Sequence, residues 1–162
     1  MAKIPAIVEG LIDGRQIAAE AGTTILEACR QNGIGVPTLC HHEGLEAEGG
    51  CRLCLVEMDG KLLASCQYPL RSSGFKVLTM SDEVKRARRL VIALMLTRAP
   101  DSKVVLDLAR AYGVRQDPRL NRSPADGCLR CGRCVRACAA AGGEAISLVG
   151  RGAGRRVMGP FD

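Results

Sequence analysis

Residues 38–54 read TLCHHEGLEAEGGCRLC. Cys40 is followed, after ten intervening residues, by Cys51 and Cys54, and a lone cysteine, Cys66, comes twelve residues later. Small residues between the first two cysteines, including Gly49 and Gly50, allow a loop to pass close to a bound group and turn its amides inward. The stretch therefore predicts a metal centre held by four thiols.

A second set of four thiols lies in CLRCGRCVRAC, residues 128–138. Three cysteines, each separated by two residues, and a fourth after three more have the spacing of bacterial ferredoxins. We expect a tight loop to hold the first three and a following helix to hold the fourth, around one [4Fe–4S] cluster. Because no second run is present, the fourth completes the same cluster by elimination, unless a partner chain intervenes; Ala139 stands where proline is usual. The predicted ligands are Cys128, Cys131, Cys134 and Cys138.

Zinc is the rival metal for both sets, but zinc sites more often use two separated cysteine pairs. The first set has one pair flanked by two lone thiols, which suits a [2Fe–2S] cluster in which each iron takes two thiolates. His41 and His42 could replace two thiols, as in Rieske centres. With Cys66 available, four thiols suffice, and we expect the histidines to flank the loop. The predicted [2Fe–2S] ligands are Cys40, Cys51, Cys54 and Cys66.

Charge and composition limit the partners and the cellular compartment that are expected for the chain. The 162 residues carry a formal charge of +6 with neutral thiols, and two four-thiolate clusters would lower it to roughly +2. That balance is weak support for binding nucleic acid. The start, MAKIPAIVEG, lacks the pattern of a secretory signal, and the longest apolar run, LVIALML, is too short to span a bilayer. We therefore expect the cytoplasm, and in that reducing compartment nine cysteines are not a disulfide framework.

Periodicity and turn residues predict a first domain with strands and one helix. Residues 4–20 read as two strands joined at Asp13-Gly14, and residues 54–66 as a hairpin turning at Asp59-Gly60. Between them, TTILEACRQNGI reads as a helix that Thr23 or Thr24 caps and Gly33 ends. Cys29 lies on its apolar face and is expected to be a small buried hydrophobe. FKVLTM, residues 75–80, reads as the last strand.

Two helices and a second hairpin are expected further on. The first helix starts at Ser81-Asp82 and runs to about Thr97, with LVIALML buried and the basic run 85–89 solvated. The second starts at Pro100-Asp101 and runs to about Tyr112. Residues 114–127 read as a linker, and ISLVGRGAGRRVMG as a hairpin. The core stripe of the second helix is expected to be Val104, Val105, Leu108 and Tyr112.

Three segments together resemble a known family: TTILEACRQNGIGVPTLCHH, GGCRLCLVEMDG, and CLRCGRCVRAC followed by AISLVGRG. They are similar to the front of the large iron–sulfur subunit of respiratory complex I, of NAD-linked and iron-only hydrogenases, and of NAD-dependent formate dehydrogenases. The resemblance implies an α+β chain with a β-grasp [2Fe–2S] ferredoxin domain (1–80), a helical connector and linker (81–127) and a bacterial-ferredoxin-like [4Fe–4S] module (128–162). Many relatives bind another cluster in the connector through one His and three Cys, but residues 97–113 contain neither.

No catalytic site is evident in the sequence. GRGAGRR lacks the spacing of a dinucleotide loop, and nothing resembles a nucleophile–base pair. We therefore expect a relay subunit that passes single electrons between a flavin- or NAD(P)-binding subunit and a catalytic subunit such as a hydrogenase or formate dehydrogenase, with no nucleic acid bound and no membrane insertion. Arg130, Arg133 and Arg136 would raise the potential of the second cluster, or serve only solubility.

The alternative is an iron–sulfur redox sensor or nucleic-acid-binding module, which the arginines make conceivable. The absence of a helix-turn-helix pattern and an aromatic content of 2% count against it. Within the relay class, the iron–sulfur subunit of succinate dehydrogenase also joins a [2Fe–2S] domain to bacterial-type motifs, but its first cysteine gap and its further cysteine runs do not match this chain.

Overall fold

A computed structural model describes residues 7–120 and 127–161 of the chain. The residues fall into two compact units. The first combines the described residues up to Thr38 with Arg52–Arg88, and the second combines Leu39–Cys51 with the described residues from Arg89 onward. The segment that carries Cys40 and Cys51 thus groups with the C-terminal half of the chain, whereas the cysteines at 54 and 66 belong to the first unit.

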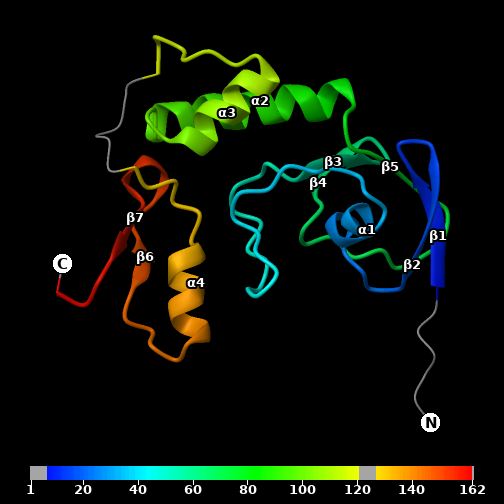
Figure 1. Ribbon diagram of the computed structural model, residues 1–162, viewed down its shortest axis with the longest axis horizontal. Helices are drawn as coiled ribbons and strands as arrows, with labels where there is room; N and C mark the ends of the chain where they lie inside the picture. The colour runs from blue at the N-terminus through cyan, green and yellow to red at the C-terminus, as the bar shows by residue number, and fades with distance from the viewer. Residues whose placement is uncertain (1–6, 121–126, 162) are drawn as a thin grey trace. The chain divides into compact units, whose positions relative to one another are not determined.

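The first unit is built on a five-stranded mixed sheet (Figure 1). Its strand order is β2-β1-β5-β3-β4, in which β1 and β5 are parallel and the other neighbours are antiparallel. A mixed sheet with helices agrees with the expected α+β ferredoxin-like domain. The strands are β1 (Ile7–Ile12), β2 (Arg15–Glu20), β3 (Leu55–Met58), β4 (Lys61–Ala64) and β5 (Phe75–Leu78).

Both predicted hairpins of this sheet are confirmed. Asp13 and Gly14 have φ of 49° and 78°, and Asp59 and Gly60 have φ of 51° and 71°. Two successive residues with positive φ are the requirement of a type I′ turn, whose twist matches that of the flanking strands. Asp13 also accepts hydrogen bonds from the backbone N–H of Thr79 (2.7 Å) and from its hydroxyl (2.5 Å), which joins the first hairpin to the end of β5.

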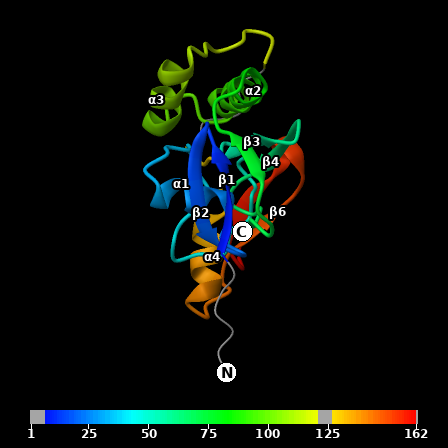
Figure 2. The ribbon, with the colours of Figure 1, turned by 90° about the vertical axis from the view of Figure 1, so that its right-hand side faces the viewer.

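Helix α1 (Ile25–Gln31) lies beside the β1–β2 hairpin, as Figures 1 and 2 show. The Thr24 hydroxyl accepts from the N–H of Glu27 at 3.2 Å, so the predicted cap is confirmed. Cys29 is fully buried in the core between helix and sheet, as expected. Burial chiefly raises the pKa of its thiol to about 11, with a further contribution from Asp13.

Helix α2 (Asp82–Arg98) corrects two predictions. Its start is as expected, because the Ser81 hydroxyl accepts from the N–H of Val84 at 3.3 Å. The apolar run is not buried throughout: Leu90 and Leu94 are 63% and 52% exposed, because they lie on the opposite side of the helix from buried Ile92 and Leu96. The basic run is not wholly solvated either, because Arg88 is fully buried.

The second unit contains α3 (Lys103–Tyr112), which ends at Gly113 with φ of 63°. Its core stripe differs from the prediction, since Val105 and Ala109 are buried but Val104 is 53% exposed.

The predicted C-terminal hairpin is confirmed: β6 (Ser147–Val149) pairs antiparallel with β7 (Arg156–Met158), with the short helix η1 (Gly152–Gly154) between them. Helix α4 (Arg133–Ala140) precedes that hairpin. Residues 121–126 of the predicted linker lie outside the described residues. None of the described helices combines the length and hydrophobicity needed to cross a bilayer.

Candidate functional site

Cys54 and Cys66 meet in the first unit. Cys54 directly precedes β3 and Cys66 follows β4 by two residues, so the antiparallel pairing of Leu55 with Ala64 brings the two cysteines together. Their sulfurs are 3.4 Å apart, and both residues are buried. Two thiolates on one tetrahedral metal, with bonds of about 2.3 Å, would lie about 3.8 Å apart. The hairpin thus presents a buried pair of thiols at nearly the spacing of ligands to one metal ion.

Backbone hydrogen bonds hold this pair in place. The carbonyl of Cys54 accepts from the N–H of Ser65 at 3.1 Å and from its hydroxyl at 2.7 Å. Ser65 is fully buried and its own carbonyl accepts from the N–H of Leu26 at 3.0 Å. Helix α1 and the β3–β4 hairpin therefore fix the two cysteines together.

Cys40 and Cys51 form the corresponding pair in the second unit. The N–H of Cys51 points at the sulfur of Cys40, 3.5 Å away. A hydrogen bond between the two side chains and then burial raise the pKa of the Cys40 thiol, while the amides of Cys51 and Gly50 act in the opposite direction by favouring the thiolate. Gly49, with φ of 66°, supplies the left-handed turn that brings these amides round to the sulfur.

The two histidines lie at the side of this loop. His41 is half-buried and His42 is exposed. The Nδ1 atom of His42 accepts from the N–H of Gly44 at 3.2 Å, so that nitrogen is engaged by the loop's own backbone. Both positions agree with flanking roles.

The C-terminal cysteines differ in part from the expected arrangement. Cys128 and Cys131 lie in an irregular segment, but Cys134 lies on α4 with Cys138, one turn before it, and not in the loop. Gly132, with φ of 70°, turns the chain into the helix, so α4 begins one residue before the third cysteine. The sulfur of Cys138 accepts from the N–H of Ala145 at 3.2 Å.

None of the nine cysteines forms a disulfide bond. Over residues 7–120 and 127–161, no three side chains of His, Cys, Asp or Glu converge as ligands of a single metal ion. In the structure, the first set of cysteines thus forms two pairs, each within its own unit. The second set lies within one short segment of the chain.

Comparison with known proteins identifies the fold around the first set. Residues 7–82 match the family described as "2Fe-2S iron-sulfur cluster binding domain", and this range contains all four cysteines of the first set. Residues 7–82 belong to this family. The predicted resemblance to the front of the complex I subunit is also confirmed, because the relatives of the chain include that subunit.

The relatives extend the match beyond the 2Fe–2S domain. The chain is 33% identical over 172 residues to the NADH-ubiquinone oxidoreductase 75 kDa subunit of Reclinomonas americana, covering 90% of this chain and 25% of that protein. It is 31% identical over 177 residues to the mitochondrial NADH dehydrogenase [ubiquinone] iron-sulfur protein 1 of Solanum tuberosum, covering 93% and 24%. A crystal structure of NAD+-reducing [NiFe]-hydrogenase in the H2-reduced state is similar with a TM-score of 0.85 at 29% identity, covering 96% of this chain and 76% of that one. The chain thus spans about a quarter of the length of these two curated relatives.

Arg88, at the end of the first unit, is a residue near Cys54 that sequence reasoning missed. Its guanidinium is fully buried and donates from Nε to the carbonyl of Leu53 (3.0 Å) and from a terminal nitrogen to that of Leu55 (2.7 Å). These two carbonyls lie on either side of Cys54. The signal that would have found it is spacing: Val84, Arg88 and Ile92 recur every four residues on the buried side of α2.

The donor chemistry of the 2Fe–2S domain fits the cluster that its family name implies. Its four predicted ligand thiols form no disulfide and occur in close pairs, and the amides of Cys51 and Gly50 act on the sulfur of Cys40. Zinc ribbons would need two close cysteine pairs in sequence, and here only Cys51 and Cys54 are such a pair.

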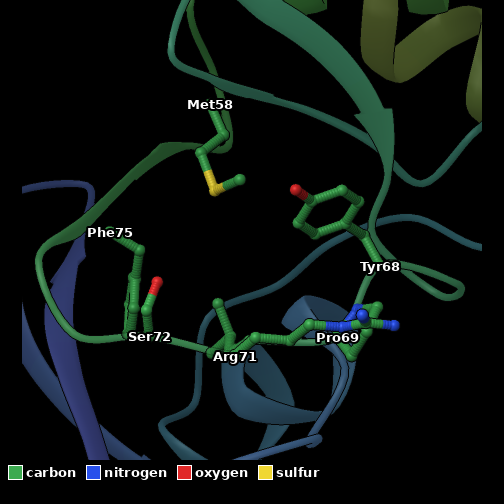
Figure 3. A pocket seen from close by; sticks show the side chains of 7 residues that line it. Met58, Tyr68, Pro69, Arg71, Ser72 and Phe75 are labelled. Carbon is green, nitrogen blue, oxygen red and sulfur yellow. The ribbon is translucent and has the colours of Figure 1, made fainter.

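A pocket of about 430 Å³ opens elsewhere in the 2Fe–2S domain (Figure 3). Across it the hydroxyl of Tyr68 faces the thioether of Met58, and Arg71 supplies the one charged group of its lining. The lining contains neither a thiol nor a nucleophile with an adjacent base, so it offers no catalytic constellation. Its remaining lining residues are Pro69, Leu70, Ser72 and Phe75.

Proposed function

We propose that this chain is an electron-relay subunit of a multi-subunit oxidoreductase and that it carries one [2Fe–2S] and one [4Fe–4S] cluster. The observation that most supports this proposal is the close, buried pair of sulfurs of Cys54 and Cys66 inside a domain of the 2Fe–2S family. Functionally the chain divides into a β-grasp ferredoxin domain (1–80), a connector (81–127) and a [4Fe–4S] module (128–162).

The first cluster takes its ligands as two pairs. Cys54 and Cys66 bind one iron and Cys40 and Cys51 the other, since each iron of a [2Fe–2S] cluster takes two thiolates. The mutual contacts within each pair support this division. The strand order β2-β1-β5-β3-β4, with β1 and β5 parallel at its centre, supports the β-grasp assignment.

The second cluster is held by Cys128, Cys131, Cys134 and Cys138. Their spacing is that of bacterial ferredoxins, and the match to the Reclinomonas protein covers 90% of the chain, well beyond the 2Fe–2S domain. The amide of Ala145 at the sulfur of Cys138 is the kind of contact that tunes the potential of a cluster. A residue of a partner chain in place of Cys138 is the alternative.

When bound, such clusters accept and release one electron each. The chain's own residues exclude water from Cys54 and Cys66, which are 1% and 2% exposed, and aim amides at the sulfurs of Cys40 and Cys138. Hydrogen bonds to a thiolate stabilise its charge and that of the added electron. The proposed partners are a flavin- or NAD(P)-binding subunit and a catalytic oxidoreductase subunit, as the complexes of the relatives suggest. Nine cysteines without a disulfide bond support the cytoplasm as the proposed compartment.

Single cysteine substitutions test the two ligand sets. Cys51→Ser is expected to remove the [2Fe–2S] signal in electron paramagnetic resonance of the dithionite-reduced protein, while Cys134→Ser removes only the [4Fe–4S] signal. Cys29→Ala is the matched control, because Cys29 is buried in the apolar core and should leave both signals in place. Retention of both signals in Cys51→Ser would show that the ligand assignment is wrong.

A further inference from the structure

Two arginines of the C-terminal cysteine motif, Arg133 and Arg136, contact the loop that carries Cys40 and Cys51. Arg136 lies on α4 between Cys134 and Cys138, and its side chain is only 16% exposed. One terminal nitrogen of its guanidinium donates to the carbonyl of Glu46 at 2.6 Å. The other donates to the carbonyl of Cys40 and, at 3.4 Å, to the carbonyl of Cys131.

A single guanidinium therefore binds the backbone of one proposed [2Fe–2S] ligand, Cys40, and of one proposed [4Fe–4S] ligand, Cys131. Both contacts lie within the second compact unit, which contains the segment Leu39–Cys51 as well as α4. The planar fork of arginine suits this task, because it presents five N–H donors in fixed directions.

Neighbouring residues strengthen the same attachment. A terminal nitrogen of Arg133 donates to the carbonyl of His41 at 2.6 Å. The carboxylate of Glu48, in the loop, lies 3.5 Å from Nε of Arg136 and 3.1 Å from a terminal nitrogen of Arg155. A Cβ on Gly132 would lie 2.5 Å from an oxygen of that carboxylate, so a larger residue there would displace the Glu48 side chain from its present position beside Arg136.

The loop needs such partners because it contains neither helix nor strand. Backbone carbonyls without a regular partner must find donors elsewhere, and side chains or water supply them. Arg133 and Arg136 supply donors to three carbonyls of the loop, those of Cys40, His41 and Glu46. Glu48 neutralises part of the charge that they bring.

We propose that Arg136 is a positioning residue for both clusters: it fixes the Cys40 loop to the Cys131–Cys138 segment, so that retention of iron in one site depends on the integrity of the other. The proposal rests on the proposed function, because it presumes that both cysteine sets bind clusters. The positive charge of Arg136 also favours the reduced, more negative state of each cluster and raises its midpoint potential.

The test compares three variants of the 162-residue holoprotein. Arg136→Met removes charge and donors, and Arg136→Lys keeps the charge but loses the fork. Arg110→Met is the matched control, because Arg110 also belongs to the second unit, is 76% exposed and pairs only with Asp107 among the contacts observed. Three quantities are measured anaerobically: iron release to a chelator, the midpoint potentials of both clusters, and hydrogen exchange of residues 39–51.

We expect both Arg136 variants to release iron from both clusters about tenfold faster than wild type, which corresponds to one lost charge-assisted hydrogen bond. Exchange of the 39–51 amides should accelerate by a similar factor. The potentials should become more negative in Arg136→Met and stay near wild type in Arg136→Lys, a distinction that a purely structural role does not produce. Arg110→Met should match wild type throughout.

The proposal is overturned if both Arg136 variants match Arg110→Met in iron release and in exchange. Should Arg136→Met fail to fold, Arg136→Lys decides: wild-type release and exchange rates in that variant overturn the proposal. A wild-type protein without clusters would instead refute the proposed function, and the exchange of residues 39–51 would still show whether Arg136 holds the loop.

Discussion

Replacing Arg88 with methionine should destabilise the chain by about 3 to 4 kcal/mol, although Arg88 lies in a run of basic residues that reads as a solvated surface. Its buried guanidinium donates to the carbonyls of Leu53 and Leu55 and, at 3.2 Å, to the sulfur of Met80. Hydrogen bonds from a charged donor contribute about 1.5 to 3 kcal/mol each. Their loss leaves two carbonyls short of a donor, while removal of a buried charge offsets part of the cost.

The measurement is urea unfolding followed by circular dichroism, and the matched control is Arg86→Met. Arg86 lies on the same helix, but it is 74% exposed and pairs with Glu83 at 3.0 Å. That exposed ion pair contributes at most about 1 kcal/mol, so the control should change the free energy of unfolding little. A melting temperature roughly 10 °C below wild type would accompany the loss in Arg88→Met. If the two variants differ in stability by less than about 1 kcal/mol, Arg88 does not hold the backbone on either side of Cys54 as argued.

Two further substitutions test the packing of the first unit. Gly10→Ala should lower the free energy of unfolding in urea by about 2 to 3 kcal/mol, because a Cβ there would lie 2.5 Å from the ring and the carbonyl oxygen of Phe75. The control is Gly35→Ala, which should change stability little because nothing lies within 4 Å of its Cβ position. Equal effects of the two substitutions would contradict the close approach of β1 to β5. Cys29→Ala should remove a pH dependence. The folded thiol keeps its proton up to a pKa of about 11, whereas the unfolded thiol loses it near 9.0, so wild type should lose on the order of 2 to 3 kcal/mol relative to the variant as the pH rises from 9 to 11. A constant stability difference over that range would show that the thiol is not held neutral by burial.

Local chemistry made much of the first unit predictable from the sequence. Asp13-Gly14 and Asp59-Gly60 have the positive φ that their dipeptides suggest, and Thr24 caps α1. Each of these features depends on residues adjacent in sequence, which is where turn and capping preferences operate. The buried place of Cys29 followed from the helical period for the same reason.

Contacts between residues far apart in the chain could not be predicted from the sequence. Arg88 has the same residue type as its exposed neighbour Arg89, and only the fold brings the carbonyls of residues 53 and 55 to it. The three arginines of the second cysteine motif read as a source of positive charge, and nothing in the sequence connects Arg136 to carbonyls some 90 residues away. Leu90 and Leu94 read as core because an apolar run does not show which of its sides faces water.

The candidate sites show the same difference between local features, which the sequence indicates, and long-range features, which it does not. Cysteine spacing proposes the members of each set, because a loop or a hairpin limits how far apart such thiols lie, and within the first set the structure shows two close pairs. It did not predict that Cys134 would lie on α4, or that Cys40 and Cys51 would group with the C-terminal half of the chain. Those features depend on how the backbone folds around Gly132 and on the arginines that hold the loop.

Iron and acid-labile sulfide, counted per chain in protein purified anaerobically, test the central claim most directly. One [2Fe–2S] and one [4Fe–4S] cluster predict about six atoms of each. Zinc bound without sulfide would contradict the account, since the eight thiols would then hold a structural metal that carries no electrons.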